Sequence, residues 1–423
     1  MTRAAALALL VAACKSVPVG PSDAGPYDGG PAVDVLQHHN GGSRDALYVE
    51  PAFTHAAVQG MHLDPGFSAT VDGHVYAQPL VIAGPRAMLI VATESNQVSA
   101  LDAATGAVLW RKTLGAPVPL SQLECGNIDP LGITGTLFVP YGGHYGDCGD
   151  YHGTILAIPV AAPQTAFSWR TRAQGGAVWA PSGISSDGTS IFAATGNTFG
   201  ATSWADGEAV FRFAPAAPLT AADQFYPSNW KNLDDGDVDL GGSGALLVHV
   251  PGATPADLAV ALGKDGKAYL LDRNHLGGIG GQIFSASVSS SAIITAPAAY
   301  RTPSATYIAF HGAPAGGCSG DLTALRISAT TPPAATFAWC AKQNGRGSPI
   351  ATTTDGQSEP LVWAVGSEDD NRLRAFDGDT GAVVFGGGGS AEAMGTVRRF
   401  QSPVISGGRV YVAGDGRVYA FRP

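Results

Sequence analysis

Short runs in which apolar and polar residues alternate recur along the chain, and the clearest series lies between Leu89 and Gly115. It contains three candidate strands, LIVAT, VSALD and AVLWRKT, separated by the polar turns ESNQ and AATG. Val, Leu and aromatic residues favour strands, whereas Asp, Asn and Gly favour the tight turns of β-hairpins. The series recurs at Leu373–Phe385, with shorter versions at Lys267–Gly278 and Arg409–Phe421. This pattern predicts repeated antiparallel β-units.

A strand of small residues precedes each unit and is introduced by a Ser/Thr/Gln-Pro or Ser-Gly step. Seven such strands begin at Ala77, Thr134, Ala180, Gly242, Thr295, Gly347 and Gln401. Their mean spacing, from Pro79 to Pro403, is 54 residues, which suits a four-stranded blade of a β-propeller. Small side chains fit the innermost strands because these crowd around the axis of the ring.

The pattern therefore predicts an all-β fold, a single β-propeller of seven four-stranded blades. Eight blades would follow if the stretch from Ala180 to Gly242 held a further degenerate unit. The last unit ends at Pro423 after three strands, and the stretch from Phe67 to Val75 has no partner of its own. We expect this stretch to supply the missing strand, so that pairing of the two chain ends closes the ring.

Composition agrees with a turn-rich β protein and limits the classes of partner. The chain of 423 residues contains 57 Gly and 29 Pro, and only 14% of its residues are charged. Its formal net charge is −10, and no dense cluster of Lys and Arg is present. This charge excludes binding to nucleic acid by counterion release, and it disfavours adhesion to an anionic lipid surface.

The first residues resemble an export signal. Ala4 to Ala13 form an apolar run, too short to span a bilayer, that leads into Val11-Ala12-Ala13-Cys14, a sequence similar to a bacterial lipobox. We expect a signal peptide at 1–13, lipidation of Cys14, a flexible tether at 14–45 and the propeller at 46–423. The alternative is ordinary secretory cleavage nearby. Lys15, which follows the cysteine, favours the outer membrane, and His38-His39 is expected to be a solvated pair in the tether.

Four cysteines remain for the exported domain, an even number in an oxidising compartment. Three pairings are possible, and the local one joins Cys125 to Cys148 and Cys318 to Cys340. Each bond would close a loop of a size that a disulfide can stabilise. The alternative for the first pair is a metal site with His144 and His152, although the Cys-x-x-Cys spacing of structural zinc sites is missing.

The unit SALDAATGAVLW resembles the pyrroloquinoline-quinone (PQQ)-like repeat, whose Trp packs between neighbouring blades and whose Asp/Thr-Gly turn links two outer strands. Segments such as VDGHVYAQPL, YPSNWKNLDDGDVDLGGSG and VGSEDDNRLRAFDGDTGAVVF are similar to those of exported bacterial PQQ-like propellers. The resemblance extends from about Val71 to the C-terminus. It implies the fold but no particular activity, because propellers serve many functions.

Residues just before the inner strands should gather at one mouth of the central channel, where they can bind a small polar ligand. They are Gln78, Asp129, Trp179, Asp239, Arg346, Arg399 and Gln401. The alternative is that these side chains cap the inner strands or form salt bridges with one another.

A second candidate site is the acidic segment before the fourth inner strand. Asp235, Asp237 and Asp239 alternate along it and could hold Ca²⁺ through their oxygens, although it lacks the spacing of an EF-hand. The alternative is a solvated acidic loop. We expect no cofactor: calcium is possible at this loop, whereas PQQ is not expected, since the chain lacks the adjacent cysteine pair that its resemblance to quinoprotein dehydrogenases would imply.

No catalytic residues stand out, because no Ser-His-Asp order, P-loop or GxSxG motif is present. We therefore expect a non-catalytic binding or scaffold propeller, anchored to the membrane through a lipid, with a small polar ligand or a protein partner at the channel mouth. The alternative is a PQQ- and Ca²⁺-dependent oxidoreductase. A third possibility, also implied by the resemblance, is an assembly-factor-like protein that pairs with a strand of its partner.

Overall fold

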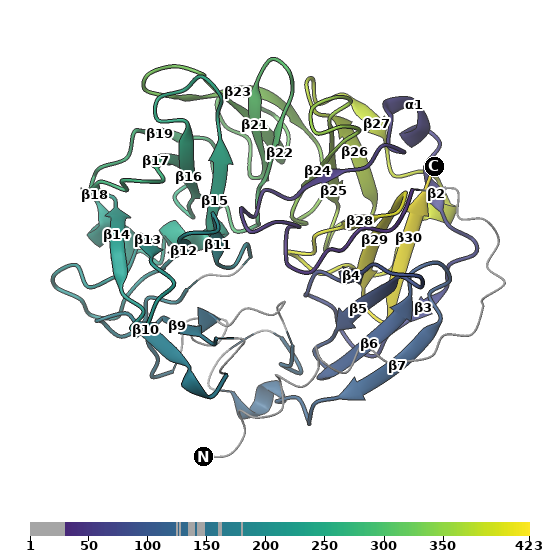
Figure 1. The fold of residues 1–423 in the computed structure, drawn as a ribbon, viewed down its shortest axis with the longest axis horizontal. Coiled ribbons are helices and arrows are strands. Elements are labelled where there is room, and N and C mark those ends of the chain that lie inside the picture. Colours follow the sequence, from purple (N-terminus) through teal and green to yellow (C-terminus); the bar gives the residue numbers. More distant parts are fainter. Residues whose placement is uncertain are drawn as a thin grey trace.

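The computed structural model describes residues 30–123, 126, 128–133, 140–141, 149–159, 163–178 and 181–423. Residues 1–13, Cys14, Cys125, His144, Cys148 and Trp179 lie outside these residues, so the predictions made for them stay predictions. Figure 1 shows the sheets arranged around a ring, as in a β-propeller.

The described strands form seven sheets, in which most neighbouring strands are antiparallel. The first sheet comprises β4 (Leu80–Ile82), β5 (Met88–Ala92), β6 (Gln97–Asp102) and β7 (Val108–Thr113). The second comprises β8 (Pro140–Tyr141), β9 (Thr154–Ala157) and β10 (Phe167–Arg170). The third comprises β11 (Ser185–Ser186), β12 (Ile191–Ala194), β13 (Val210–Phe213), β14 (Ala221–Tyr226) and the parallel strand β18 (Gly278–Ile279).

The remaining sheets come from the second half of the chain together with its N-terminal strands. The fourth comprises β15 (Ala245–His249), β16 (Asp257–Leu262), β17 (Lys267–Asp272) and β19 (Phe284–Ser287). The fifth comprises β20 (Ala298–Arg301), β21 (Thr306–His311), β22 (Leu322–Ile327) and β23 (Ala335–Ala341). The sixth comprises β24 (Ile350–Thr353), β25 (Leu361–Val365), β26 (Leu373–Asp377), β27 (Val383–Phe385) and β1 (Leu47–Val49). The seventh comprises β28 (Val404–Ser406), β29 (Arg409–Gly414), β30 (Arg417–Arg422), β2 (His62–Leu63) and β3 (Ala69–Thr70).

Helices are few and short among the described residues. They are α1 (His55–Val58), α2 (Trp230–Asp235) and the 3-10 turns η2 (Leu120–Gln122), η3 (Pro163–Thr165), η4 (Leu240–Ser243) and η5 (Ser390–Glu392). The all-β fold class is thus confirmed. The described part of the stretch from 181 to 242 contributes strands to one sheet, β11 to β14, while the number of blades remains a prediction.

The two ends of the chain meet in the seventh sheet. Strand β30 pairs antiparallel with β3, where Ala69 lies opposite Val418, and with β2, where His62 lies opposite Arg422. The stretch from Phe67 to Val75 therefore supplies a closing strand as expected, and β2 adds a second contact that the sequence pattern did not reveal. Closure leaves fewer exposed backbone groups at the sheet edges.

The hydrophobic core consists of layers between neighbouring sheets. Strand β16 is buried on both faces because sheets lie on either side of it. In one such layer, Trp339 of β23 donates from Nε1 to the carbonyl oxygen of Gly378, at 2.7 Å, in the turn between β26 and β27. This contact places a Trp of one sheet against the Asp/Thr-Gly turn of the next.

The segment of residues 33–50, here called the crossing segment, runs across the middle of the ring (Figure 1). Its backbone bonds to the innermost strands of several sheets: Val35 pairs with Val81 of β4, Ser43 accepts from Leu247 of β15, and Asp45 accepts from Ala299 of β20. Further contacts reach Ser186 of β11 and Ser406 of β28, and β1 lies parallel to β24.

The prediction of a flexible tether therefore does not hold for residues 35–45. His39 is fully buried, stacks on His38 at 4.3 Å between ring centroids, and contacts Ser402 Oγ through Nε2 at 2.8 Å. The expectation of a solvated histidine pair is likewise wrong. Gly, Pro, Asp and Ser in this region suggested a linker, but the buried Val35, His39 and Arg44 hold the segment inside the ring.

One of the two expected disulfides lies within the described residues and is present. Cys318, in the β21–β22 loop, is bonded to Cys340 of β23, with the two Cα atoms 5.7 Å apart. Among the described residues, no helix has the length and apolar character that a membrane span requires.

Candidate functional site

Successive strands of each sheet run in opposite directions, and this determines which loops lie on the same face of the ring. In each sheet the loop between the second and third strands opens on the same face as the connection to the next sheet. The β21–β22 and β25–β26 loops therefore lie beside the β23–β24 and β27–β28 connections. Residues of all four segments contribute to the site described below.

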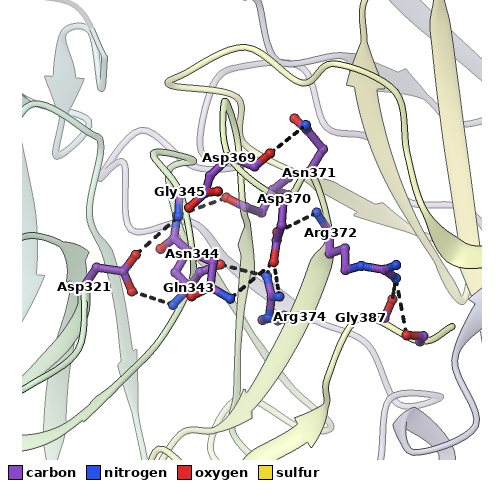
Figure 2. A network of polar contacts seen from close by, with 12 residues as sticks. Asp321, Gln343, Asn344, Gly345, Asp369, Asp370, Asn371, Arg372, Arg374 and Gly387 are labelled. Atoms are coloured by element: carbon purple, nitrogen blue, oxygen red, sulfur yellow. Dashed lines mark hydrogen bonds and ion pairs between the residues drawn. The ribbon is translucent and has the colours of Figure 1, made fainter. Parts of the chain in front are cut away.

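A network of hydrogen bonds joins the fifth and sixth sheets on this face, as Figure 2 shows. Asp321 accepts from the backbone N–H of Gln343, at 2.6 Å from Oδ1, and of Gly345, at 3.3 Å from Oδ2. Both carboxylate oxygens are thus used to hold the β23–β24 connection against the β21–β22 loop.

A second carboxylate anchors the same connection from the sixth sheet (Figure 2). Asp370 forms an ion pair with Arg374 and accepts from Asn344 Nδ2 at 3.2 Å, while Arg374 donates to the carbonyl oxygen of Gln343 at 2.8 Å. Burial alone would raise the pKa of Asp370, but the hydrogen bonds and charge of Arg374 hold it below its usual value. Asp370 is therefore charged at neutral pH, and its network fixes the loops.

Close packing at Gly345 shows how tightly these loops meet. Gly345 has a φ of +144°, and a Cβ there would lie 2.3 Å from the carbonyl carbon of Gly366. Only glycine allows this approach of the two backbones. The loops that present the neighbouring side chains are consequently pre-organised.

A pocket of about 440 Å³ opens beside this network. Its lining is mostly polar and consists of His311, Asp321, Gly345, Arg346, Ser367, Glu368 and Asp369. The volume falls within the range of small-molecule sites.

Several polar groups of the pocket have no partner within the described part of the chain. Ser367 is fully buried and its Oγ makes no hydrogen bond there, and neither does His311 Nδ1. Burial lowers the pKa of His311, and the charge of Arg346 lowers it further, although Asp321 opposes both effects. His311 is therefore a neutral imidazole at pH 7, which can donate or accept a hydrogen bond.

The wall of the pocket toward the seventh sheet is a salt bridge. Arg399 contacts Glu368 Oε2 through Nε at 2.8 Å, and its backbone N–H donates to Oε1 at 3.3 Å. Of the candidates for the channel mouth, Arg346 thus lines the pocket and Arg399 supports it. Arg399 forms a salt bridge, but its partner Glu368 is not among those candidates.

The other described candidates have structural contacts elsewhere. Gln78 and Gln401 are buried: Gln78 Oε1 accepts from His39 N, and Gln401 Nε2 donates to the carbonyl oxygens of Val75 and Ala77. Asp129 is exposed and accepts from Leu120 N at 2.9 Å, so it caps the turn η2. The structure does not bring these three residues into the pocket.

The three carboxylates of the candidate calcium site do not converge. Asp235 ends helix α2 and pairs with Lys231, whereas Asp237 pairs with Lys264 at 2.8 Å. Asp239 is fully buried, accepts from Asn197 N and also pairs with Lys264. The segment folds as a helix and a 3-10 turn, so its alternating aspartates do not share one side.

A buried carboxyl group that the sequence did not reveal lies beside Asp239. Glu208 is fully buried and accepts from Leu240 N at 2.6 Å through Oε2, while its Oε1 has no partner in the described residues. Burial and the charge of Asp239 raise the pKa of Glu208 to about 9. Glu208 is therefore protonated at neutral pH, which suits a structural rather than an ionic role.

Most of the pocket was not predicted from the sequence. Asp321, Ser367, Glu368 and Asp369 follow the second strands of their sheets, and His311 is the last residue of β21. The prediction from the sequence considered only residues that precede the first strand of each sheet. The same strand-order argument would have placed them on this face.

Three of the solved structures of similar fold are dehydrogenases. Quinohemoprotein alcohol dehydrogenase ADHIIG from Pseudomonas putida HK5 is 11% identical, with a TM-score of 0.55 over 92% of this chain and 80% of that chain. The quinohemoprotein alcohol dehydrogenase from Comamonas testosteroni is 13% identical, with a TM-score of 0.54 over the same shares. A europium-containing methanol dehydrogenase is 12% identical, with a TM-score of 0.54 over 92% of this chain and 98% of that chain. At these identities the likeness shows the fold alone.

No curated protein matches the chain. Residues 66–139 match a family model described as outer membrane protein assembly factor BamB, and the clear repeat at Leu89–Gly115 lies inside them. Residues 66–139 are thus similar to the PQQ-like repeat of that model, and the solved structures show a β-propeller fold for the chain.

Proposed function

We propose that this propeller is an exported, non-catalytic binding protein that holds a small polar ligand in the pocket beside Arg346. The observation that carries the proposal is a rigid polar pocket in which Arg346, Ser367 and His311 present groups without partners among the described residues. Buried polar groups normally find hydrogen bonds, so an unpaired hydroxyl and imidazole in a pocket point to a polar occupant.

The lipobox-like sequence supports attachment to the membrane, which we propose is the outer membrane. A diacylglycerol on Cys14 would tether the propeller and leave its pocket in solution. Cys14→Ser should move the protein from the membrane fraction to the soluble fraction of cells expressing it. Retention of this variant in membranes would contradict the lipid anchor.

The experiment that tests the binding proposal is a thermal-shift screen of polar metabolites against the full-length protein in detergent. A ligand present at 100 times its dissociation constant should stabilise the native state by about 2.7 kcal/mol. We expect at least one compound to raise the melting temperature, and Arg346→Gln to abolish that rise. Arg326→Gln, which changes an exposed arginine on β22 outside the pocket, is the matched control. A screen in which no response depends on Arg346 would contradict the proposal.

The alternative function is a PQQ- and Ca²⁺-dependent oxidoreductase, which the names of the similar structures suggest. In the part of the chain that the structure describes, no group of three His, Cys, Asp or Glu side chains is placed to hold a metal ion. The sequence also lacks adjacent cysteines. The described residues do not fit this cofactor pair, and we derive no step through it. Dye-linked dehydrogenase activity restored by PQQ with Ca²⁺ would favour the alternative.

The family model also suggests a protein partner, since its description names an assembly factor. A scaffold of this kind would hold the partner at the channel mouth, over the same loops. A pull-down from outer-membrane extracts tests this alternative. If the wild type retains a defined outer-membrane protein and Arg346→Gln does not, the occupant of the site is a protein segment rather than a small ligand.

A further inference from the structure

The charged side chains around the pocket differ in whether they already have a partner. Glu368 is paired with Arg399, and Asp370 with Arg374. Asp321 accepts two backbone hydrogen bonds from the β23–β24 connection. These three carboxylates are committed to holding the loops.

Two other charged side chains of the lining, Arg346 and Asp369, do not hold the loops in this way. Within the described residues, the guanidinium of Arg346 and the carboxylate of Asp369 make no side-chain hydrogen bond or ion pair, and both residues are exposed. Asp369 uses only its carbonyl oxygen, which accepts from Asn371 at 3.1 Å (Figure 2). Among the residues that the structure describes, Arg346 and Asp369 thus give the pocket a cation and an anion that no other side chain pairs with.

The remaining unpaired groups favour an oxygen-rich ligand group. Ser367 supplies a buried O–H, and neutral His311 can supply an N–H, both in the lining that also contains Arg346. Arginine binds carboxylates with paired N–H donors, and hydroxyl and imidazole donors can satisfy the further lone pairs. Asp369 would in turn accept from an ammonium group.

We propose that the pocket takes a small zwitterion of the amino-acid class, whose carboxylate binds Arg346 and whose ammonium group binds Asp369. This inference rests on the proposed binding function and adds the chemical class of the ligand. A dicarboxylate would suffer repulsion from Asp321 and Asp369. A neutral sugar would lack a stacking surface, because His311 carries the only ring among the described residues that line the pocket.

The test is a binding titration of the full-length protein in detergent with the free L-amino acids. Each acid is compared with its N-acetyl derivative, which lacks the ammonium charge, and with its amide, which lacks the carboxylate. Succinate and maltose serve as a dicarboxylate and a neutral sugar. We expect at least one free amino acid to bind, and both of its derivatives to bind at least tenfold more weakly.

Two variants test which charge of the protein binds which charge of the ligand. Arg346→Gln should remove the preference for the acid over the amide, and Asp369→Asn should remove the preference for the free amine over the N-acetyl form. Arg326→Gln should keep both preferences. Because neither Arg346 nor Asp369 holds another described residue through its side chain, the melting temperatures without ligand should stay unchanged.

The outcomes separate a failure of the zwitterion inference from a failure of the proposed binding function. If succinate or maltose binds in a manner that requires Arg346 while the amino acids do not, the zwitterion inference is overturned and the binding function stands. Equal binding of a free amino acid and both derivatives also overturns it. If no probe shows dependence on Arg346, the inference and the binding function fail together.

Discussion

Glu208 illustrates how burial changes the chemistry of a single side chain. Its folded pKa of about 9 lies far above the value of an exposed glutamate, because burial and the neighbouring Asp239 disfavour its charge. Between these two pKa values the folded protein keeps a proton that the unfolded chain has lost. The resulting stability is fully present below the unfolded pKa and is lost as pH rises toward 9.

We therefore predict that the free energy of unfolding falls as pH rises from 7 to 9. Below this range the buried His38, His39 and His311 act with the opposite sign, because burial lowers their pKa values. The contribution of Glu208 to the slope is up to about 1.4 kcal/mol per pH unit. Glu208→Gln should make this dependence shallower, whereas Glu359→Gln, at an exposed carboxyl group, should leave it unchanged. Urea unfolding at several pH values measures the slope, and identical slopes for wild type and Glu208→Gln would argue against a buried protonated carboxyl.

The turn between β26 and β27 is the element that joins two neighbouring sheets. Asp377 Oδ1 accepts from the backbone N–H groups of Asp379 and Thr380 and from Thr380 Oγ1, and Asp102 makes the same contacts in the first sheet. Gly381 then has a φ of +74°, and a Cβ there would lie 2.7 Å from Trp339.

Gly381→Ala should therefore cost more than Gly188→Ala, where φ is +88° and no atom lies within 4 Å of a Cβ. In the control variant, stability falls only because alanine disfavours the left-handed conformation, which costs about 1–2 kcal/mol. Gly381→Ala adds an overpacking cost against Trp339, typically about 1–3 kcal/mol. Denaturant unfolding of both variants checks this, and equal losses of stability would show that the contact between sheets tolerates the extra methyl group.

The Cys318–Cys340 disulfide ties the β21–β22 loop to β23, close to the loops that bear the pocket. Its sequence separation of 22 residues predicts a stabilisation of about 3 kcal/mol by restriction of the unfolded chain. The double variant Cys318→Ala/Cys340→Ala should lose about this amount in denaturant unfolding. Unchanged stability would mean that the loop is held by its other contacts.

At the level of strands and turns the sequence predicted the repeated strands well, because hairpin turns and strand composition are local signals. The closing strand near Phe67 was also predictable, since an incomplete last unit needs a partner. The conformation of the acidic segment was not predictable. Helix α2 ends at Asp235 and a 3-10 turn follows Asp239, so the aspartates that alternate along the sequence do not lie on one side of the segment. Among the described candidates, Arg346 alone was predicted in the lining of the pocket, since most other lining residues lie at the end of a second strand or in the loop that follows it.

The crossing segment acts on the whole molecule, because it links inner strands that are far apart in the sequence. Arg44 shows its integration: it is buried and donates to Ile184 O at 2.9 Å and to His38 O at 2.6 Å. Composition could not reveal this role, since the same residue types also make linkers. The boundary of the folded domain therefore lies before Val35 rather than at residue 46.

Deletion of residues 33–50 should lower the melting temperature by several degrees and make the unfolding transition less cooperative, since backbone bonds to several sheets are lost. The control is the double variant Val33→Ser/Leu36→Ser, which changes two exposed side chains and keeps the backbone contacts. Calorimetry compares the three proteins. A deletion variant that unfolds like the wild type would show that the sheets form a stable ring without the segment.

The central claim, a ligand site at the mouth of a closed propeller, is tested most directly by hydrogen–deuterium exchange with the tightest binder from the titration. We expect slower exchange in residues 342–349 and 366–372, which carry Arg346, Ser367 and Asp369, and no such change in Arg346→Gln. Protection confined to another part of the ring, or protection that persists in Arg346→Gln, would contradict the account.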